Sequence, residues 1–552
     1  MMSLGWFGMV VFILSNFYFG AISTLVVLLA FSLILFGLVI VPLKHYMLYT
    51  FLDGEEKEQI VRAKIQANEY EVQDPHLKYP LTKNMFKTIV PIALVMLLVY
   101  SLILGQVGNG LHALPEQEET SSTTWNGEYR NQLIEQIEAE DTLYFIASYG
   151  GGLKANIWNL LILDTLFNSN GAFQIMDKTL AMSGVSGGAL GQAFYLSLLD
   201  RRDSRKIIRN VGASDFLSGD ISFLLGFDLL RELVPFRADF QTRDRSGCSM
   251  ERYASLFSDS TMTEVPFQAY WRNKYLACNR RLPVLIANTM GTNHKRGIAC
   301  SIDFERVFPD VFPNSIDILD LPGAKTLSYT DAVSTSNRFP VISPAAKIIS
   351  RGHFVDGGYF ENSGLLSLVD YYDFLRRDRL IDSLLNNRTI IFIQINNGRR
   401  SWVKHDAQDL MNKALELEDQ YSNVRESAEL NSVIGTITSL DDLPEYVLAR
   451  LEKHAKDLPQ IKVVQILLPY RYDIDYVKSL LQKTPANILE LGAKADKNNA
   501  ELQEVLSQTN GYHHPSIVEP VTARVLTQAP VDYMEVIMQK GGVLDSLRSI
   551  MN

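Results

Sequence analysis

The sequence Ala181-Met-Ser-Gly-Val-Ser-Gly-Gly-Ala-Leu190 carries the pattern Gly-x-Ser-x-Gly, with Ser186 at its centre. This spacing is typical of a sharp turn between a strand and a helix, where glycines avoid clashes and the serine hydroxyl stands clear of its backbone. The residues before the turn are apolar, as in a buried strand, and residues 189–199 have the pattern of a helix packed on that strand. Taken alone, the pattern fits a catalytic nucleophile and an ordinary Gly-Ser turn equally well.

A second motif is a run of three glycines at 150–152, between a predicted strand at 143–148 and a predicted helix at 156–167. Backbone N–H groups of such a loop can point into one cavity, and the positive end of the following helix adds to their field. This suits an oxyanion hole, whose donors must lie where negative charge develops. A phosphate-binding loop is less well supported, because neither GxxxxGK[ST] nor GxGxxG is present.

The third motif places an acid at the end of a short apolar run. Asp356 follows the predicted strand and is itself followed by Gly357 and Gly358. A carboxylate at a strand end can accept the proton of a serine that lies within hydrogen-bond reach. Considered alone, this stretch fits an ordinary Asp-Gly turn.

Together, and in this order, the three motifs resemble those of the patatin-like phospholipase family. Residues 331–344 are similar to the small-residue segment that precedes the aspartate in that family, so the resemblance covers about residues 140–365. It implies a three-layer α/β/α hydrolase domain that works without a metal or organic cofactor. It also implies a catalytic Ser–Asp dyad, with Ser186 as the nucleophile and Asp356 as its base.

The resemblance extends to the residues around the dyad. It implies an oxyanion hole formed by Gly150, Gly151, Gly152 and Gly187. Lys154 stands where the family usually has an arginine, and it is a candidate substrate-binding residue. A solvated lysine in the first turn of a helix is the alternative interpretation.

The order of the predicted elements indicates the same fold class independently of the family. Strand, glycine loop, helix, strand, turn and helix follow one another, which predicts parallel strands with crossover helices in an α/β sheet. Further core strands are predicted at 282–288, 389–395 and 461–468. Residues 216–236 are apolar and fit either a lid over the serine or a helical insertion at the sheet edge.

Composition excludes several classes of function. The formal net charge of −10 argues against a nucleic-acid partner. The three cysteines, Cys248, Cys278 and Cys300, form no CxxC pair, and no other metal-ligand spacing is present, so we predict no metal site. His513 and His514 are adjacent, which is more typical of a surface turn than of a metal site.

The N-terminal region is strongly apolar. Residues 1–43 contain no charged side chain and are long enough for one or two membrane-spanning helices, and residues 89–108 form a further candidate span. A signal peptide fits poorly, because basic residues are missing at the start and the apolar run is too long. A buried helical hairpin also fits poorly, because it would show a polar face.

The charges beside these segments predict a topology. Residues 44–88 are rich in Lys and Arg, whereas none occurs between the last span and Arg130, so the positive-inside rule places 44–88 in the cytoplasm. The catalytic region would then lie on the non-cytoplasmic side. The predicted regions are a transmembrane segment (1–43), a cytoplasmic loop (44–88), a transmembrane helix (89–108), a linker (109–130), a catalytic core (131–400) and a C-terminal helical and core-completing region (401–552).

The sequence therefore predicts a membrane-anchored serine hydrolase that cleaves acyl esters of membrane lipids, of phospholipase A or lysophospholipase type. One alternative is an α/β-hydrolase-type esterase or thioesterase with a Ser-His-Asp triad. Its histidine would be one of His405, His454, His513 and His514. Another alternative is a catalytically inactive membrane scaffold. The sequence defines neither the lipid, nor the ester position, nor the oligomeric state.

Overall fold

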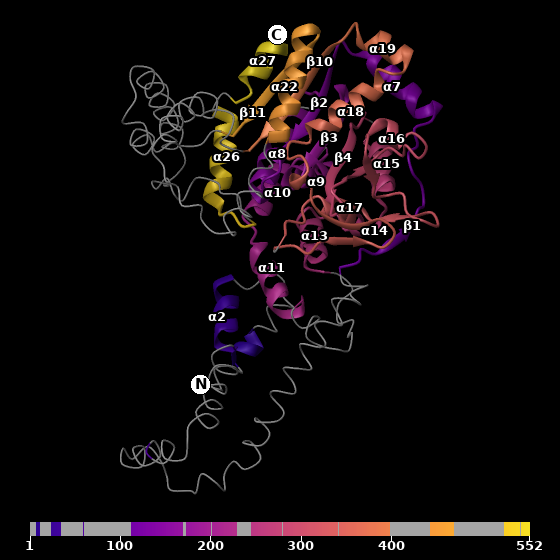
Figure 1. Cartoon of the computed structure of the whole chain (residues 1–552). Coiled ribbons are helices and arrows are strands. Elements are labelled where there is room, and N and C mark those ends of the chain that lie inside the picture. Colours follow the sequence, from indigo (N-terminus) through magenta and orange to yellow (C-terminus); the bar gives the residue numbers. More distant parts are fainter. Residues whose placement is uncertain are drawn as a thin grey trace, which may run out of the picture. The chain divides into compact units, whose positions relative to one another are not determined.

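A computed structural model of the chain describes residues 7–11, 24–34, 59, 112–168, 173–199, 201–228, 244–278, 280–340, 342–397, 442–468, 524–540 and 543–551 (Figure 1). The chain divides into two compact units. The first consists of residues 1–111 and 215–245, and the second of residues 112–214 and 246–552.

Five parallel strands form the centre of a nine-stranded sheet in the second unit. They lie in the order β11-β10-β2-β3-β4. Their bounds are β2 (Thr142–Ser148), β3 (Thr179–Val185), β4 (Val284–Gly291), β10 (Thr389–Asn396) and β11 (Ile461–Leu467). Runs such as Ile390-Ile-Phe-Ile393 are apolar at every position because central parallel strands are buried on both faces. The central parallel sheet is as predicted.

The sheet continues beyond β4 with a mixed set of short strands. β5 (Arg296–Cys300) and β9 (Gly352–Asp356) both run antiparallel to β4. β6 (Ser315–Asp317) pairs with β5, and β8 (Ala346–Ile348) pairs with β9. A separate two-stranded sheet joins β1 (Glu116–Glu118) to β7 (Lys325–Leu327). The antiparallel pairing of β9 with β4 carries Asp356 back toward β3.

Helices flank the central sheet. The chain passes from β2 through α8 (Gly152–Phe167) to β3 and then into α9 (Gly187–Tyr195), and these two helices pack together. From β9 the chain passes through α18 (Leu365–Leu375) to β10, which lies on the other side of β2 from β3. Helix α18 packs against α22 (Asp442–Asp457). Crossovers between parallel strands are right-handed. Because the chain adds β3 and β4 on one side of β2 and β10 and β11 on the other, α8 and α9 lie on one face of the sheet and α18 and α22 on the opposite face.

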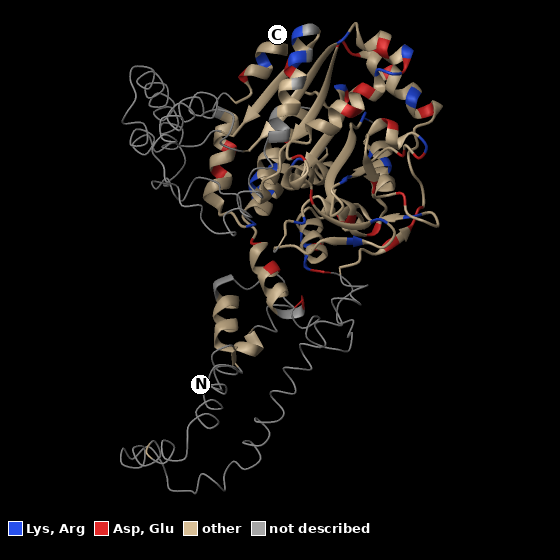
Figure 2. Cartoon of the chain, in the orientation of Figure 1, with Lys and Arg blue, Asp and Glu red and all other residues tan. Residues whose placement is uncertain are grey.

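Charged side chains are sparse in the central strands and more frequent on outer helices such as α7 (Gly127–Ala139) and α19 (Arg379–Leu385) (Figure 2). The core contains stacked rings of Phe145 and Phe392, whose centroids are 4.9 Å apart. Tyr372 of α18 meets both rings edge-on. This aromatic cluster fixes α18 over β2 and β10.

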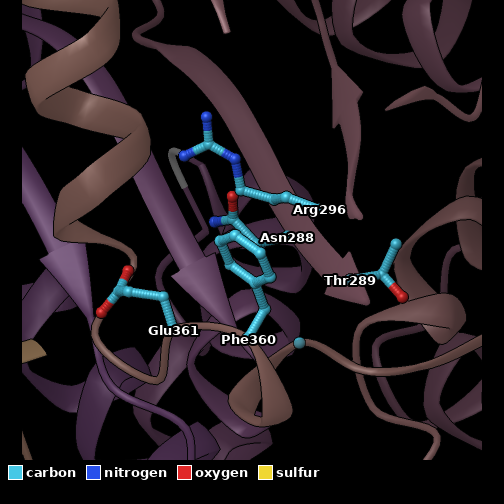
Figure 3. A pocket seen from close by; sticks show the side chains of 6 residues that line it. Asn288, Thr289, Arg296, Phe360 and Glu361 are labelled. Carbon is cyan, nitrogen blue, oxygen red and sulfur yellow. The ribbon is translucent and has the colours of Figure 1, made fainter. Parts of the chain in front are cut away.

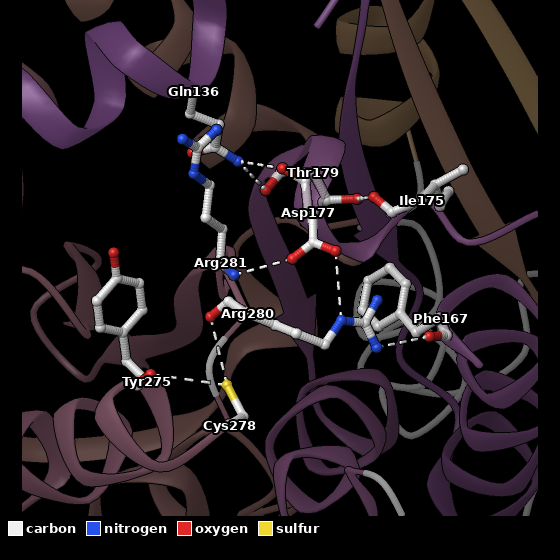
Figure 4. Close-up of polar contacts among 9 residues, drawn as sticks. All are labelled: Gln136, Phe167, Ile175, Asp177, Thr179, Tyr275, Cys278, Arg280 and Arg281. Atoms are coloured by element: carbon white, nitrogen blue, oxygen red, sulfur yellow. Dashed lines mark hydrogen bonds and ion pairs between the residues drawn. The ribbon is translucent and has the colours of Figure 1, made fainter. Parts of the chain in front are cut away.

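A polar cluster secures the amino-terminal end of β3 (Figure 4). The Asp177 carboxylate accepts hydrogen bonds from the Arg281 backbone N–H at 2.9 Å and from Arg280 Nε at 3.3 Å. The Gln136 side-chain amide donates to the Asp177 carbonyl at 2.8 Å. Arg280 also donates to the carbonyl of Phe167 at 3.2 Å, so the cluster joins the end of α8 to the start of β3.

The first unit includes α2 (Thr24–Ile34), α11 (Leu217–Phe223) and the π-turn Leu224–Asp228. Val27 and Ala30 of α2 are buried and pack against Ile221 and Leu225. In this unit the apolar stretch predicted as a lid or an insertion is helical up to Asp228, and its remainder lies outside the described residues.

The membrane predictions fall largely on residues that the structure does not describe. Residue 59 is the one described position within 44–88, and 89–108 are outside the described residues altogether. In the parts that are described, no helix combines the length and the apolarity needed to cross a membrane.

Candidate active site

Ser186 lies at the turn between β3 and α9, in an unusual backbone conformation with φ 52° and ψ −126°. Few non-glycine residues adopt such a conformation, and it persists only where the surrounding structure enforces it. Two flanking glycines explain how the turn closes. A Cβ on Gly184 would lie 2.7 Å from Cα of Ala189, and a Cβ on Gly188 would lie 2.5 Å from the Tyr149 carbonyl oxygen.

The Ser186 hydroxyl donates a hydrogen bond of 2.6 Å to Oδ2 of Asp356. Asp356 ends β9, and its other oxygen accepts from the Gly358 N–H at 2.9 Å. The carboxyl is almost completely buried, and burial raises its pKa to about 6, although the bonds from Ser186 and Gly358 and the charge of Arg524 act in the opposite direction. At neutral pH, Asp356 is therefore ionised, desolvated and in contact with a hydroxyl.

The glycine loop lies directly against the turn that carries Ser186. Gly151 and Gly152 have positive φ angles of 147° and 62°, which only glycine adopts readily. A Cβ on Gly187 would lie 2.0 Å from the carbonyl oxygen of Gly152, so glycine at that position permits the loop and the turn to touch. The N-termini of α8 and α9, with their first N–H groups, consequently lie next to each other.

These N–H groups are the candidate oxyanion donors. The first N–H groups of an α-helix have no acceptor within the helix, which applies to Gly151 and Gly152 at the start of α8 and to Gly187 at the start of α9. Gly150 differs from the expectation, because its N–H donates to the carbonyl of Asn362 at 3.0 Å. Its place in the loop is still restricted, since a Cβ there would lie 2.3 Å from Oδ1 of Asn362.

Lys154 lies in the first turn of α8, next to the glycine loop. It is 6% exposed, which argues against a solvated first-turn residue. Its role in binding a substrate stays a prediction.

Several residues of the site were not singled out from the sequence. Ser336 Oγ accepts from the Ser186 N–H at 2.8 Å, and Asn337 Oδ1 lies 3.3 Å from Ser186 Oγ. Both belong to the small-residue segment 331–344, so the resemblance of that segment is the sequence feature that could have indicated them. Asn397 follows β10 and donates to the carbonyl of Gly150 at 2.9 Å, and no local pattern marks it.

A buried polar network supports the turn from below. The Asn288 amide on β4 donates to Ser183 Oγ at 2.8 Å and to the Gly184 carbonyl at 2.9 Å. Arg296 on β5 bonds to Ser367 and pairs with Asp370. Asn288, Arg296, Phe360 and Glu361 line a small pocket that is too narrow to hold a water molecule, and the Phe360 ring lies beside the Asn288 side chain (Figure 3). This pocket has no room for a substrate, and the contacts that support the turn are the hydrogen bonds of Asn288.

The triad alternative requires a histidine next to the carboxylate. In the part of the chain that the structure describes, the hydrogen-bond donors to the Asp356 carboxylate are Ser186 and Gly358. His454 lies in α22, and His405, His513 and His514 are outside the described residues. Across the described ranges, no group of three or more metal-ligating side chains is found.

Comparisons with known proteins leave the family open. No family model matches the chain, and no curated protein matches it. Among solved structures, the chain is similar to VipD from Legionella pneumophila, with 13% sequence identity over 74% of this chain and 86% of that chain, and a TM-score of 0.20. A similarity this weak carries no argument about fold or activity, so the functional conclusion depends on the geometry of Ser186, Asp356 and the glycine loop.

Proposed function

We propose that this protein is a serine hydrolase that cleaves acyl esters of lipids with a Ser186–Asp356 dyad. The observation that carries the proposal is the 2.6 Å hydrogen bond between Ser186 Oγ and the buried Asp356 carboxylate, at a turn with a strained serine backbone. A serine nucleophile is activated by a general base within hydrogen-bond reach, and the buried Asp356 carboxylate occupies that position.

The geometry supports the following reaction. Ser186 Oγ attacks the ester carbonyl carbon while Asp356 takes the hydroxyl proton. The resulting oxyanion accepts hydrogen bonds from the N–H groups at the starts of α8 and α9, each contributing about 2.7–4 kcal/mol in comparable sites. Asp356 then returns the proton to the leaving alcohol. In the second half, Asp356 takes a proton from water, the resulting hydroxide attacks the acyl-serine, and the proton passes back to Ser186 Oγ.

The surroundings of the dyad support an apolar acyl substrate. Phe339, two residues beyond Asn337, is 46% exposed, and its ring centroid lies 5.7 Å from that of Tyr359. Burial raises the pKa of the Tyr359 phenol, and the nearby charge of the Asp356 carboxylate raises it further, which shows that this ring lies close to Asp356. An exposed Phe339 and a half-buried Tyr359, close in sequence to Asn337 and Asp356, are suited to contact an acyl chain. Phospholipase A and lysophospholipase reactions belong to this substrate class, and the buried Lys154 is a candidate partner for an anionic head group.

Attachment to a membrane is part of the same proposal. In the first unit, Phe7, Val10, Leu28 and Leu29 expose between 44% and 63% of their surface. Exposed apolar side chains on a helix are costly in water and favourable in lipid. Residues 1–43 and 89–108 would form the anchor, with 44–88 in the cytoplasm and the catalytic region on the opposite side. In Ser121→Cys, labelling of intact cells by a membrane-impermeant maleimide supports this orientation, and labelling only after permeabilisation reverses it.

The test of the activity compares the wild-type protein with Ser186→Ala in two assays. A fluorophosphonate probe should label the wild type and not the variant. Incubation with a mixed lipid extract should release free fatty acid only with the wild type, and the products identify the ester that is cut. Equal release of fatty acid by both proteins would reject Ser186 as the nucleophile.

A further inference from the structure

The C-terminal segment of the chain packs on the helices beside the active site. Val531 of α26 (Gln528–Lys540) is fully buried, and it lies so close to Gly212 that a Cβ there would be 2.5 Å from a Val531 methyl. Glu535 pairs with Arg209 at 2.6 Å, and Thr165 of α8 donates to the Met538 sulfur at 3.0 Å. These contacts attach α26 to α8 and to α10 (Ser204–Gly212), and α8 is the helix that begins at the glycine loop.

Just before this helix, Arg524 reaches the loop that follows Ser336. Its Nη2 donates to the Asn337 carbonyl at 3.1 Å and to Ser343 Oγ at 2.5 Å. Arg524 thus contacts the backbone of Asn337, whereas the side-chain Oδ1 of Asn337 lies 3.3 Å from Ser186 Oγ. Arg524 therefore ties together both ends of a loop whose first residue contacts the nucleophile.

Burial raises the pKa of Asp356, and the hydrogen bonds from Ser186 and Gly358 lower it. The charge of Arg524 adds a further, smaller lowering of the same pKa. Other titratable or charged side chains on elements around Asp356 are Lys154, Arg296, Arg338, Tyr359 and Glu361. The Arg338 guanidinium donates to the Pro344 carbonyl at 3.2 Å and Arg296 pairs with Asp370, so both cations have their own acceptors.

We propose that Arg524 is a positioning residue of the active site, supplied by the C-terminal segment, which holds the 337–343 loop against Ser186. The inference rests on the proposed function, because it concerns the dyad of that reaction. It adds to the catalytic motifs a residue that lies more than a hundred positions beyond them in the sequence.

The test is the pH dependence of kcat/KM for a short-chain ester, measured with the full-length protein. The acid limb of this profile reports the pKa of the base in the free enzyme. Loss of the cation in Arg524→Gln raises the pKa of Asp356, so the acid limb moves to higher pH. For each ~0.5 pH unit that the limb moves, activity below the midpoint falls about threefold, whereas activity at pH 8 falls less. Arg524→Lys keeps the charge and should keep the limb at its wild-type position.

A matched control separates positioning from docking of the segment. Glu535→Gln removes the ion pair with Arg209 in the same segment, so it should lower the melting temperature without moving the acid limb. If Arg524→Gln does not fold, Arg524→Met gives the same comparison with a side chain of similar length and no charge.

The outcomes distinguish this inference from the proposed function. An acid limb that stays in place when the charge at 524 is lost, or that moves equally in Arg524→Lys, overturns the role of Arg524 while leaving the dyad intact. Hydrolysis that does not depend on Ser186 in the otherwise unchanged protein rejects the proposed function itself. A limb that moves with the charge at position 524 and not in Glu535→Gln supports the inference.

Discussion

The carboxylates at the two ends of β3 differ in their exposure to solvent and in their hydrogen-bond donors. At the amino end, Asp177 has a side chain that is 40% exposed, and it accepts hydrogen bonds from a guanidinium and a backbone N–H. At the carboxyl end, Asp356 is 3% exposed, and its donors are the neutral hydroxyl of Ser186 and one backbone N–H. The first carboxylate is hydrated and paired with a cation, so it stabilises the fold. The second is desolvated beside the Ser186 hydroxyl, which costs stability and fits the role of base in the proposed dyad.

The largest expected effect breaks the carboxyl-end pair. Ser186→Ala should abolish ester hydrolysis, and Asp356→Asn should lower kcat/KM by about 10²–10⁴-fold, because the amide cannot take the serine proton. Both variants should remain folded, as judged by circular dichroism. Near-normal turnover of a short-chain ester by either variant would reject the dyad.

The second largest effect is expected from a substitution at the contact between the glycine loop and the turn that carries Ser186. In Gly187→Ala the new methyl group would meet the Gly152 carbonyl at 2.0 Å, so the loop must move and the oxyanion donors lose their alignment. We expect kcat to fall by about 10²–10³-fold, the effect of losing one such donor. The matched control is Gly127→Ala at the start of α7, where a Cβ would meet nothing within 4 Å. Equal activity of the two variants would argue against donors at this junction.

The third prediction concerns stability at the carboxyl end. The pKa of Asp356 is raised to about 6 in the folded protein from 3.8, so the folded state binds the proton more tightly than the unfolded state. The burial of this carboxylate is therefore destabilising above pH 6, and stability is regained as pH falls from about 6 to about 4. Asp356→Asn removes this titration. The change that the substitution makes to the free energy of unfolding should therefore be more favourable at pH 8 than at pH 4, by about 1–3 kcal/mol. Denaturant unfolding at both pH values measures this, and an equal change at the two would contradict it.

The smallest effect is expected at the amino end. Asp177→Asn weakens the bonds to Arg280 and Arg281 and should lower the free energy of unfolding by about 1 kcal/mol, in line with a partly exposed, charge-assisted contact. The kcat/KM for ester hydrolysis should change less than about twofold, because Asp177 lies at the end of β3 opposite to Ser186. A large loss of activity without loss of stability would show that the two ends are coupled.

Local patterns predicted much of the site because its motifs depend on steric rules that act within a few residues. The glycines around Ser186 and the Asp-Gly-Gly turn are needed wherever a chain reverses this tightly. The same rules cannot say which glycine N–H remains available. Gly150 was expected to line the oxyanion hole, yet its N–H is bonded to Asn362, a partner more than two hundred residues away.

Local sequence patterns predict the apolar parallel strands, the sharp turn at Ser186 and an acid at the end of a strand, since each depends on neighbouring residues. The contact between Asp356 and Ser186 follows from packing alone, because the pairing of β9 with β4 brings the two strand ends together. Packing also decided the contributions of Asn337, Asn397 and Arg524. A long-range hydrogen bond leaves no periodic or spacing signal in the chain, because it depends on how distant elements pack.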